Sequence, residues 1–220
     1  MAELNLEQAR YNMIEQQVRT WEVLDQRVLD TMAAVPRERF VPERVRNLAF
    51  ADIQLPIGHG QVMMEPKLEG RLLQALGLNP SDSVLEVGTG TGYLTACLAK
   101  LAGRVVTVER HPELSQAAQE RVRSLDIGNV TFRVGEAADG WEQDGRFDAI
   151  ALTGSLPEVP EGYKRQLKVG GRLFVVVGAP PVMEALLITQ VGESEWSRES
   201  LFDTELPLLE GAVRPQPFVF

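Results

Sequence analysis

Residues that bind metals or form disulfides are scarce in this sequence, which contains one cysteine and two histidines among 220 residues. The lone cysteine, Cys97, cannot form a disulfide within the chain. Its position on a predicted apolar helix favours a buried small side chain over a reactive thiol. No cluster of His, Cys and Asp has the spacing of a metal site, so we expect no bound metal.

Positive charge is scarce too, since 22 Lys and Arg residues stand against 31 Asp and Glu residues, a net charge of −9. Binding nucleic acid without regard to its sequence needs clustered basic residues, so nucleic acid is not an expected partner. No apolar run reaches the ~20 residues that span a bilayer, and no basic-then-apolar leader opens the chain. We expect a soluble, cytoplasmic protein without membrane or nucleic-acid partners. Small-molecule and protein substrates remain open, as does the oligomeric state.

The N-terminal region predicts helices that precede the rest of the fold. An apolar stripe covers residues 4–20, and a second helix is expected to begin at Asp25, a good cap, and to end before Pro36. A short third helix is expected to begin at Pro42. Because no Gly/Ser-rich or repetitive stretch interrupts this region, we interpret it as a helical extension and not as a linker.

Prolines and glycines break up the apolar residues of 49–66, which predicts an irregular segment with room for a short strand. The apolar positions that follow predict a helix over 67–76, and Gly77 is suited to end it in the left-handed conformation. At the other end of the chain, the apolar tail 214–220 suggests docking onto the body of the protein or onto a partner.

From residue 84 onward, short continuous apolar runs alternate with helical patterns. Strands buried on both faces have this pattern, so it indicates a parallel sheet with helices on both sides. The runs at 185–191 and 199–207 predict two strands that pair antiparallel at the sheet edge. The expected fold is a Rossmann-like, doubly wound, mostly parallel α/β domain with an antiparallel edge. Its expected parts, within one domain of 1–220, are helices and a loop over 1–60, the core over 61–180 and edge strands over 181–220.

The stretch Ser83–Gly92 reads Ser-Val-Leu-Glu-Val-Gly-Thr-Gly-Thr-Gly, an apolar run followed by glycines at alternate positions. Together with the helical pattern after it, this stretch predicts the strand, tight turn and helix that open a nucleotide-binding unit. The dinucleotide fingerprint needs glycines at its first, third and sixth positions, and the sixth position here is Tyr93. The loop therefore does not match a dinucleotide site.

Two carboxylates narrow the ligand of this loop. We expect Glu86 to end its strand facing the ligand crevice, where it would repel a pyrophosphate and attract an ammonium or sulfonium group. S-adenosylmethionine carries both cationic groups and no phosphate. Glu109 ends the next strand, where a carboxylate can accept hydrogen bonds from both ribose hydroxyls. The plain alternatives are that Glu86 caps a helix and that Glu109 is solvated.

In these motifs the sequence resembles the class I S-adenosylmethionine-dependent methyltransferases, and in particular the protein-L-isoaspartate O-methyltransferase family. The family-specific likeness lies in Val35-Pro-Arg-Glu-Arg-Phe-Val-Pro42, and in Asp52 with Leu55-Pro-Ile-Gly-His-Gly-Gln61. The resemblance covers residues 8–180. Within this range, the segments 84–93, 108–110, 147–150 and 167–178 follow the order and spacing of the family's motifs.

The resemblance implies S-adenosylmethionine as the cofactor, and a protein or peptide substrate whose damaged aspartyl residue, an isoaspartate, is methylated on its carboxylate as part of repair. The implied cofactor site consists of Glu86, Gly88, Thr89, Gly90, Gly92, Glu109, Arg110, Glu136 and Ala137. The implied catalytic positions are occupied by Met64, Asp52 and Gln61. A carboxylate acceptor is ionised at neutral pH, so no general base is needed.

The sequence departs from the family directly after Gln61, where the family has Thr-Ile-Ser-x-Pro. Val62 and Met64 replace the two hydroxyl residues, and a thioether cannot donate a hydrogen bond. Three interpretations are open: isoaspartyl methylation tolerates Met64, the acceptor differs, or the chain binds the cofactor without transfer, as a sensor or scaffold. Residues 153–155 are candidates to replace the missing hydroxyl, with an ordinary strand-to-helix loop as the alternative.

Plain structural roles are favoured for the two histidines and for the paired methionines. His111 precedes Pro112 and is expected at the surface. His59 lies in the loop over the crevice, where shaping the backbone is favoured over acting as a base. Met63 and Met64 are also consistent with core or pocket filler.

Overall fold

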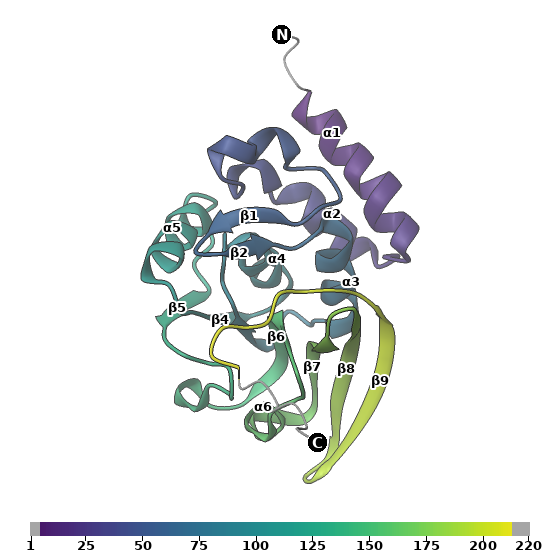
Figure 1. Cartoon of the computed structure of the whole chain (residues 1–220), viewed down its shortest axis with the longest axis vertical. Coiled ribbons are helices and arrows are strands. Elements are labelled where there is room, and N and C mark those ends of the chain that lie inside the picture. Colours follow the sequence, from purple (N-terminus) through teal and green to yellow (C-terminus); the bar gives the residue numbers. More distant parts are fainter. Residues whose placement is uncertain (1–4, 213–220) are drawn as a thin grey trace, which may run out of the picture.

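The computed structural model describes residues 5–212 as a seven-stranded sheet flanked by helices, with a separate two-stranded hairpin (Figure 1). The strand order of the large sheet is β5-β4-β3-β6-β7-β8-β9. The strands from β5 to β7 in this order are parallel, and β8 and β9 continue the sheet antiparallel. The predicted Rossmann-like fold with an antiparallel edge is confirmed. Residue 4, where the first helix is expected to begin, and the tail at 214–220 lie outside the described residues.

The strands are β1 Leu55–Gly58, β2 Gln61–Met63, β3 Ser83–Val87, β4 Arg104–Glu109, β5 Val130–Val134, β6 Phe147–Leu156, β7 Leu167–Ala179, β8 Val182–Gly192 and β9 Glu195–Asp203. The α-helices are α1 Leu6–Met13, α2 Gln26–Ala34, α3 Pro66–Leu76, α4 Tyr93–Leu101, α5 Pro112–Arg123 and α6 Glu161–Gln166. A π-helix, η1 Ile14–Val18, and the 3₁₀-helices η2 Arg19–Trp21, η3 Arg37–Arg39, η4 Glu43–Leu48 and η5 Glu142–Asp144 complete the set.

The N-terminal helices form where the sequence predicts them, although not all are α-helical. Within the predicted span 4–20, α1 continues into η1 and then η2. Asp25 caps α2, because its carboxylate accepts a hydrogen bond from the backbone N–H of Arg27 at 2.8 Å. The helix after Pro42 is a 3₁₀-helix with a kink at Val45, whose φ is −126°.

Adjacent residues of β3 belong to opposite faces of the sheet. Val84 packs in a core cluster with residues of α2, α3 and α4, whereas Leu85 packs in a second cluster that includes Tyr163 of α6. Burial on both faces explains why the strand reads as a continuous apolar run. Because side chains alternate along a strand, Glu86 points to the same face as Val84.

Four strands of the sheet have other bounds than predicted, and one of them is β8, which begins at Val182 and not at the predicted residue 185. β6 and β7 are 10 and 13 residues long and extend past the apolar runs that the sequence contains at 147–152 and 173–177, from which these two strands are expected. The run in β6 is interrupted by Thr153, Gly154 and Ser155, although Ser155 and Leu156 are buried, and the run in β7 is preceded by the exposed residues Lys168, Val169 and Gly170. β9 begins at Glu195 and ends at Asp203, earlier at both ends than the predicted 199–207. The antiparallel pairing of β8 and β9 is as predicted.

The segment 49–66 is more regular than predicted, because β1 and β2 pair as an antiparallel hairpin. Its turn consists of Gly58, His59 and Gly60, whose φ values are 106°, 52° and 71°. Glycine tolerates this left-handed region at little cost, and His59 is the non-glycine residue that the turn holds there. The Gly-His-Gly sequence is therefore a tight turn that brings the hairpin back toward α3.

Arg37 connects this segment to the body of the protein and is fully buried. Its Nε donates to the carbonyl of Ala49 at 2.9 Å, and its Nη2 donates to the carbonyl of Met64 at 2.7 Å. Its Nη1 pairs with the buried carboxylate of Glu69 on α3. The guanidinium also lies 4.8 Å from the ring centroid of Tyr93, the first residue of α4. The side chain of Arg37 thereby holds both ends of the segment 49–66 against α3 and α4.

Cys97 is buried and unbridged, as predicted. Burial raises the pKa of its thiol, which fits a small core side chain. No helix within residues 5–212 is both long and apolar enough to cross a bilayer. Over the same residues, no group of three or more side chains of metal-binding type is gathered in one place.

Candidate active site

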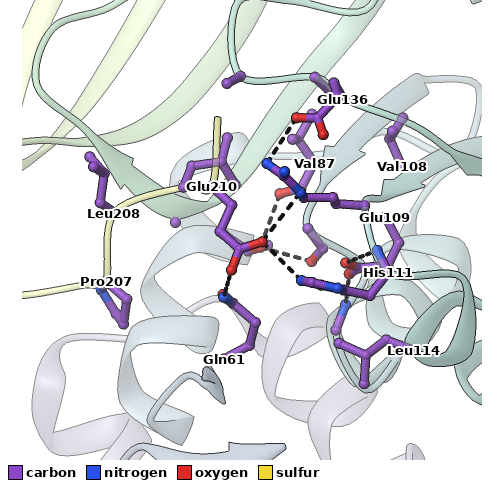
Figure 2. Close-up of a pocket in the computed structure, with 18 of the residues that line it drawn as sticks. Gln61, Val87, Val108, Glu109, His111, Leu114, Glu136, Pro207, Leu208 and Glu210 are labelled. Atoms are coloured by element: carbon purple, nitrogen blue, oxygen red, sulfur yellow. Dashed lines mark hydrogen bonds and ion pairs between the residues drawn. The ribbon is translucent and has the colours of Figure 1, made fainter. Parts of the chain in front are cut away.

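A cavity of about 70 Å³ lies at the carboxyl ends of β3, β4 and β6, beside the β1–β2 hairpin (Figure 2). Ligands of open α/β sheets bind in this position, so it is the candidate cofactor site. The cavity is also bordered by a segment after β9, residues 206–210, which we call the strap. Residues that line the cavity include Gln61, Val62, Gly88, Gly90, Glu109, Arg110, His111, Glu136, Ala137, Thr153, Gly154 and Glu210.

The glycine loop needs glycine at two positions for different reasons. Gly88 has φ 93°, and a Cβ there would lie 2.1 Å from Oγ1 of Thr153, so glycine lets the loop pass close to β6. Gly92 has φ 85°, and a Cβ there would lie 2.9 Å from Cβ of Ala118 on α5. Gly88 therefore shapes the cavity, whereas Gly92 allows α4 and α5 to pack closely.

Glu109 is buried at the wall of the cavity, and two backbone N–H groups hold its carboxylate. Gly90 donates to Oε2 at 2.8 Å, and His111 donates to Oε1 at 3.1 Å. Each oxygen keeps a further lone pair for another donor. The carboxylate is therefore fixed in position while it can still accept hydrogen bonds from a ligand.

Glu86 lies behind the glycine loop and does not face the crevice, which corrects the expectation from the sequence. The carboxylate is fully buried, and its Oε2 accepts hydrogen bonds from the hydroxyls of Thr95 at 2.5 Å and Thr107 at 2.6 Å. The hydroxyl of Thr89 lies 2.5 Å from that of Thr107, so it points to the same network. The reason is strand alternation, which directs Glu86 toward α4. Burial raises the pKa of Glu86 to about 8.

The rim of the cavity is polar. Nη1 of Arg110 lies 3.0 Å from Oε2 of Glu136, whose side chain is 61% exposed. Ala137 is buried beside this pair and lines the cavity. The residues implied for the cofactor thus separate into two groups. Gly88, Gly90, Glu109, Arg110, Glu136 and Ala137 line the cavity, whereas Glu86, Thr89 and Gly92 lie behind it.

The three implied catalytic positions are not brought together. Gln61 lines the cavity. Met64 is 5% exposed and packs in the hydrophobic core, outside the cavity lining. Asp52 also lies outside the lining and pairs with Nζ of Lys67 at 2.7 Å. The loss of a hydroxyl at position 64 is therefore accompanied by a side chain that turns into the core.

Two residues that the sequence did not single out for the site meet at the cavity, His111 and Glu210. Nε2 of His111 lies 2.9 Å from Oε2 of Glu210 (Figure 2). The imidazole of His111 also stacks on that of His59, with ring centroids 4.3 Å apart. His111 is thus a wall residue, which differs from the surface position expected for it. Its place two residues after Glu109, which ends β4, could have indicated this position.

Ser155 fastens the strap to β6. Its backbone N–H donates to the carbonyl of Pro207, its carbonyl accepts from the N–H of Leu209, and its hydroxyl donates to the carbonyl of Leu206, each at 2.9 Å. The hydroxyl of Thr153 donates to the carbonyls of Val87 and Gly88. The two hydroxyls that could replace the missing serine are therefore already engaged within the protein.

A family model described as "Protein-L-isoaspartate(D-aspartate) O-methyltransferase (PCMT)" matches residues 8–200. The chain belongs to this family. The chain is 42% identical to a protein-L-isoaspartate O-methyltransferase of Rhodopseudomonas palustris, with 93% of this chain and 96% of the relative covered. It is 39% identical to the protein of the same name from Brucella anthropi, with 90% and 91% covered.

Solved structures of the PCMT family share the fold. A structure named protein-L-isoaspartate O-methyltransferase superposes with a TM-score of 0.79 at 25% identity, over 92% of this chain and 66% of that one. A second, described as a putative protein-L-isoaspartate O-methyltransferase from Plasmodium falciparum in complex with S-adenosyl-L-homocysteine, gives a TM-score of 0.78 at 24% identity over 94% of this chain and 99% of that one. The resemblance to the family seen in the sequence is confirmed.

Proposed function

We propose that this PCMT-family chain is a methyltransferase that moves the methyl group of S-adenosylmethionine to the carboxylate of an isoaspartyl residue in a damaged protein or peptide. One observation carries the proposal: the family model spans residues 8–200, which includes every segment around the cavity except the strap. The relatives that match over nearly their whole length carry the same name.

The residues of the cavity fit S-adenosylmethionine. The carboxylate of Glu109 is held in place to accept hydrogen bonds from ribose hydroxyls, and the backbone of Gly88 and Gly90 lines the cavity beside it. Glu136, beside Ala137, is placed to accept a hydrogen bond from the adenine amino group. When bound, the cofactor supplies a methyl group that its own sulfonium already activates.

The task of the protein is then to align the acceptor and to exclude water. The acceptor carboxylate is ionised at neutral pH, so no side chain has to remove a proton from it. The hairpin and the strap cover the cavity and keep water from the reacting atoms. We assign the alignment of the acceptor to the backbone of Thr153 and Gly154, because the β6–β7 register shifts between Ala151 and Ser155 and leaves these residues outside the regular ladder.

A second candidate function follows from Met64. A side chain that is 5% exposed and packed in the core cannot orient an acceptor as a cavity hydroxyl would. The alternative is a protein that binds the same cofactor and methylates a different acceptor, or methylates none.

The experiment that separates these functions supplies isotopically labelled S-adenosylmethionine together with an isoaspartyl peptide or its normal aspartyl isomer. The proposed function requires transfer to the isoaspartyl peptide and not to the isomer. Tight cofactor binding without transfer to either peptide would favour the alternative.

We also propose a cytoplasmic location and a substrate range without nucleic acid. The single cysteine supports the cytoplasmic location. The net charge of −9 supports a substrate range without nucleic acid.

A further inference from the structure

An aspartate followed directly by a glycine occurs twice in this sequence, at Asp139–Gly140 and at Asp144–Gly145. In such a step the main-chain nitrogen of the glycine can attack the carboxyl of the aspartate, because no Cβ on the glycine shields that nitrogen. The product rearranges to isoaspartate. Both steps lie between β5 and β6, but the structure surrounds their two carboxylates differently.

Hydrogen bonds and ion pairs hold the carboxylate of Asp144, whose side chain is only 9% exposed. Arg133 donates to both of its oxygens, from Nε at 3.2 Å and from Nη2 at 3.0 Å, and Nε1 of Trp141 donates at 2.8 Å. The hydrogen bonds from Arg133 lower the pKa of Asp144, so its carboxyl is seldom protonated. The attack needs a protonated carboxyl, because one oxygen must leave as water, and it needs a side chain that can turn. Asp144 meets neither condition.

The side chain of Asp139 is exposed, and it makes no hydrogen bond or ion pair with residues 5–212. Asp139 lies in a tight turn that the backbone N–H of Gly140 closes by donating to the carbonyl of Ala137, at 3.2 Å. This hydrogen bond, at the long end of the usual range, must open before the nitrogen can reach the carboxyl. The structure therefore leaves Asp139 able to react and restrains Asp144.

The turn that contains Asp139 forms part of the wall of the cofactor cavity. Ala137 and Ala138 line this cavity, and the hydroxyl of Tyr163 donates to the carbonyl of Ala137. The carbonyl of Asp139 packs against Gly162 of α6 so closely that a Cβ on this glycine would not fit. Isoaspartate lengthens the main chain by one carbon, and this contact leaves no space for it. Isomerisation at Asp139 therefore has to shift the wall of the cavity.

We propose that Asp139–Gly140 is a site of spontaneous isomerisation in this chain, and that isoaspartate at this position disables the cofactor site. The nitrogen of Gly140 forms a bond to Cγ of Asp139, while the carboxyl hydroxyl leaves and takes up the N–H proton as water. The product is a five-membered imide. This chemistry is independent of the proposed function, because it involves no methyl transfer.

Water then opens the imide at one of its two carbonyl carbons. Attack at the main-chain carbonyl carbon of Asp139 leaves Gly140 joined to Cγ, which is isoaspartate, whereas attack at Cγ restores aspartate. The water lost in the first step is regained in the second, and nothing is oxidised or reduced. The mass of the chain is therefore unchanged, so isomerisation has to be detected by a method that distinguishes the two linkages.

The test incubates the full chain in warm neutral buffer and follows isoaspartate at both steps. Endoproteinase Asp-N cuts before aspartate but not before isoaspartate, and electron-transfer fragmentation distinguishes the two linkages in the uncut peptide. We expect isoaspartate to accumulate about tenfold faster at Asp139 than at Asp144 in the folded chain. In concentrated urea, which removes the contacts of Asp144, the two rates should become similar. Similar rates in the folded chain, or a faster reaction at Asp144, would overturn the proposal.

Two further conditions test the physical reason for the difference. Arg133→Gln removes the cation beside Asp144, so it is expected to speed isomerisation at Asp144 and to leave the rate at Asp139 unchanged. Saturating S-adenosylhomocysteine is expected to slow the reaction at Asp139, because a bound ligand holds the turn at Ala137 and Ala138 closed. No change at Asp144 in the variant, or no effect of the ligand at Asp139, would contradict this explanation.

Calorimetric titration with S-adenosylhomocysteine measures the effect on the cofactor site. The number of binding sites per chain is expected to fall in step with the isoaspartate found at position 139. Asp139→Glu is the matched control, because it keeps the charge but would have to form a six-membered imide, which forms far more slowly. This variant should keep its binding sites through the same incubation. Undiminished binding by a chain with isoaspartate at position 139, or an equal loss in the variant, would overturn the proposal.

Discussion

Gln61 and Glu210 are joined by a hydrogen bond of 2.9 Å between a side-chain amide and a carboxylate, although 149 positions separate them in the sequence. The same carboxylate lies 2.9 Å from His111 and 3.4 Å from Nε of Arg110 (Figure 2). Glu210 thereby fastens the strap to two walls of a cavity of about 70 Å³. This volume is below the range of about 300–1,000 Å³ that is typical of ligand pockets, so we expect the strap to move when the cofactor binds.

Replacing Glu210 with alanine is expected to speed cofactor association by about tenfold, since it removes three partly exposed polar contacts that hold the strap closed. Stopped-flow tryptophan fluorescence measures the rate, with Trp141 as a reporter because it packs against Gly135 of the cavity wall. Glu210→Gln keeps an amide partner for Gln61 but loses the charge, and should give an intermediate rate. An association rate that is the same in all three proteins would show that the strap does not limit entry.

Replacing Glu109 with glutamine is expected to weaken cofactor binding by roughly 10–100-fold, because a charged acceptor held by two backbone N–H groups is lost. Isothermal titration calorimetry with S-adenosylhomocysteine gives the dissociation constant. Glu113→Gln, on the exposed first turn of α5, is the matched control and should bind as the parent does. Unchanged affinity in the Glu109 variant would remove this carboxylate from the site.

The pKa of Glu86 predicts how stability depends on pH. Burial raises this pKa from 4.5 to about 8 in the folded protein, so the folded state holds a proton that the unfolded state has lost over this interval. The stabilising effect is complete below pH 4.5 and is lost as the pH rises through about 8. Urea unfolding of Glu86→Gln across this interval should show a shallower fall in stability than the parent shows. Parallel curves for the two proteins would contradict the raised pKa.

Replacing Arg37 with methionine is expected to lower the free energy of unfolding by about 3–5 kcal/mol, because the carboxylate of Glu69 would be left buried without its partner. Removing the second charge as well, in Arg37→Met/Glu69→Leu, should restore part of the loss. Chemical denaturation of the three proteins measures both effects. A double variant no more stable than the single one would show that the contacts of Arg37 with Ala49 and Met64 dominate.

Restoring the family's serine at position 64 is expected to cost about 2–4 kcal/mol of stability and to give no gain in methyl transfer. The physical reason is that Met64 packs in the core and its side chain does not reach the cofactor cavity. Val62 does line the cavity, so Val62→Thr tests a hydroxyl at the neighbouring family position. Urea denaturation and initial transfer rates measure the two effects. Faster transfer by Met64→Ser would mean that the serine position controls the reaction in this chain too.

The sequence predicted the sheet because its strands are buried on both faces and therefore read as apolar runs. It could not say on which face Glu86 lies, since both neighbours of this residue are apolar and the face is set by how α4 packs. The hairpin turn could have been predicted from the sequence, because Gly58 and Gly60 flank a single residue. No sequence pattern indicated that Glu210 belongs to the site, because its partners are brought close to it only when the strap crosses β6.

The central claim is that this chain methylates isoaspartate although it lacks a hydroxyl at position 64. The most direct measurement is the kcat/KM of the unaltered chain for one isoaspartyl peptide and its aspartyl isomer, with the labelled product identified as a base-labile methyl ester. The account predicts an ester on the isoaspartyl peptide alone. Saturable cofactor binding with no ester on either peptide would contradict it.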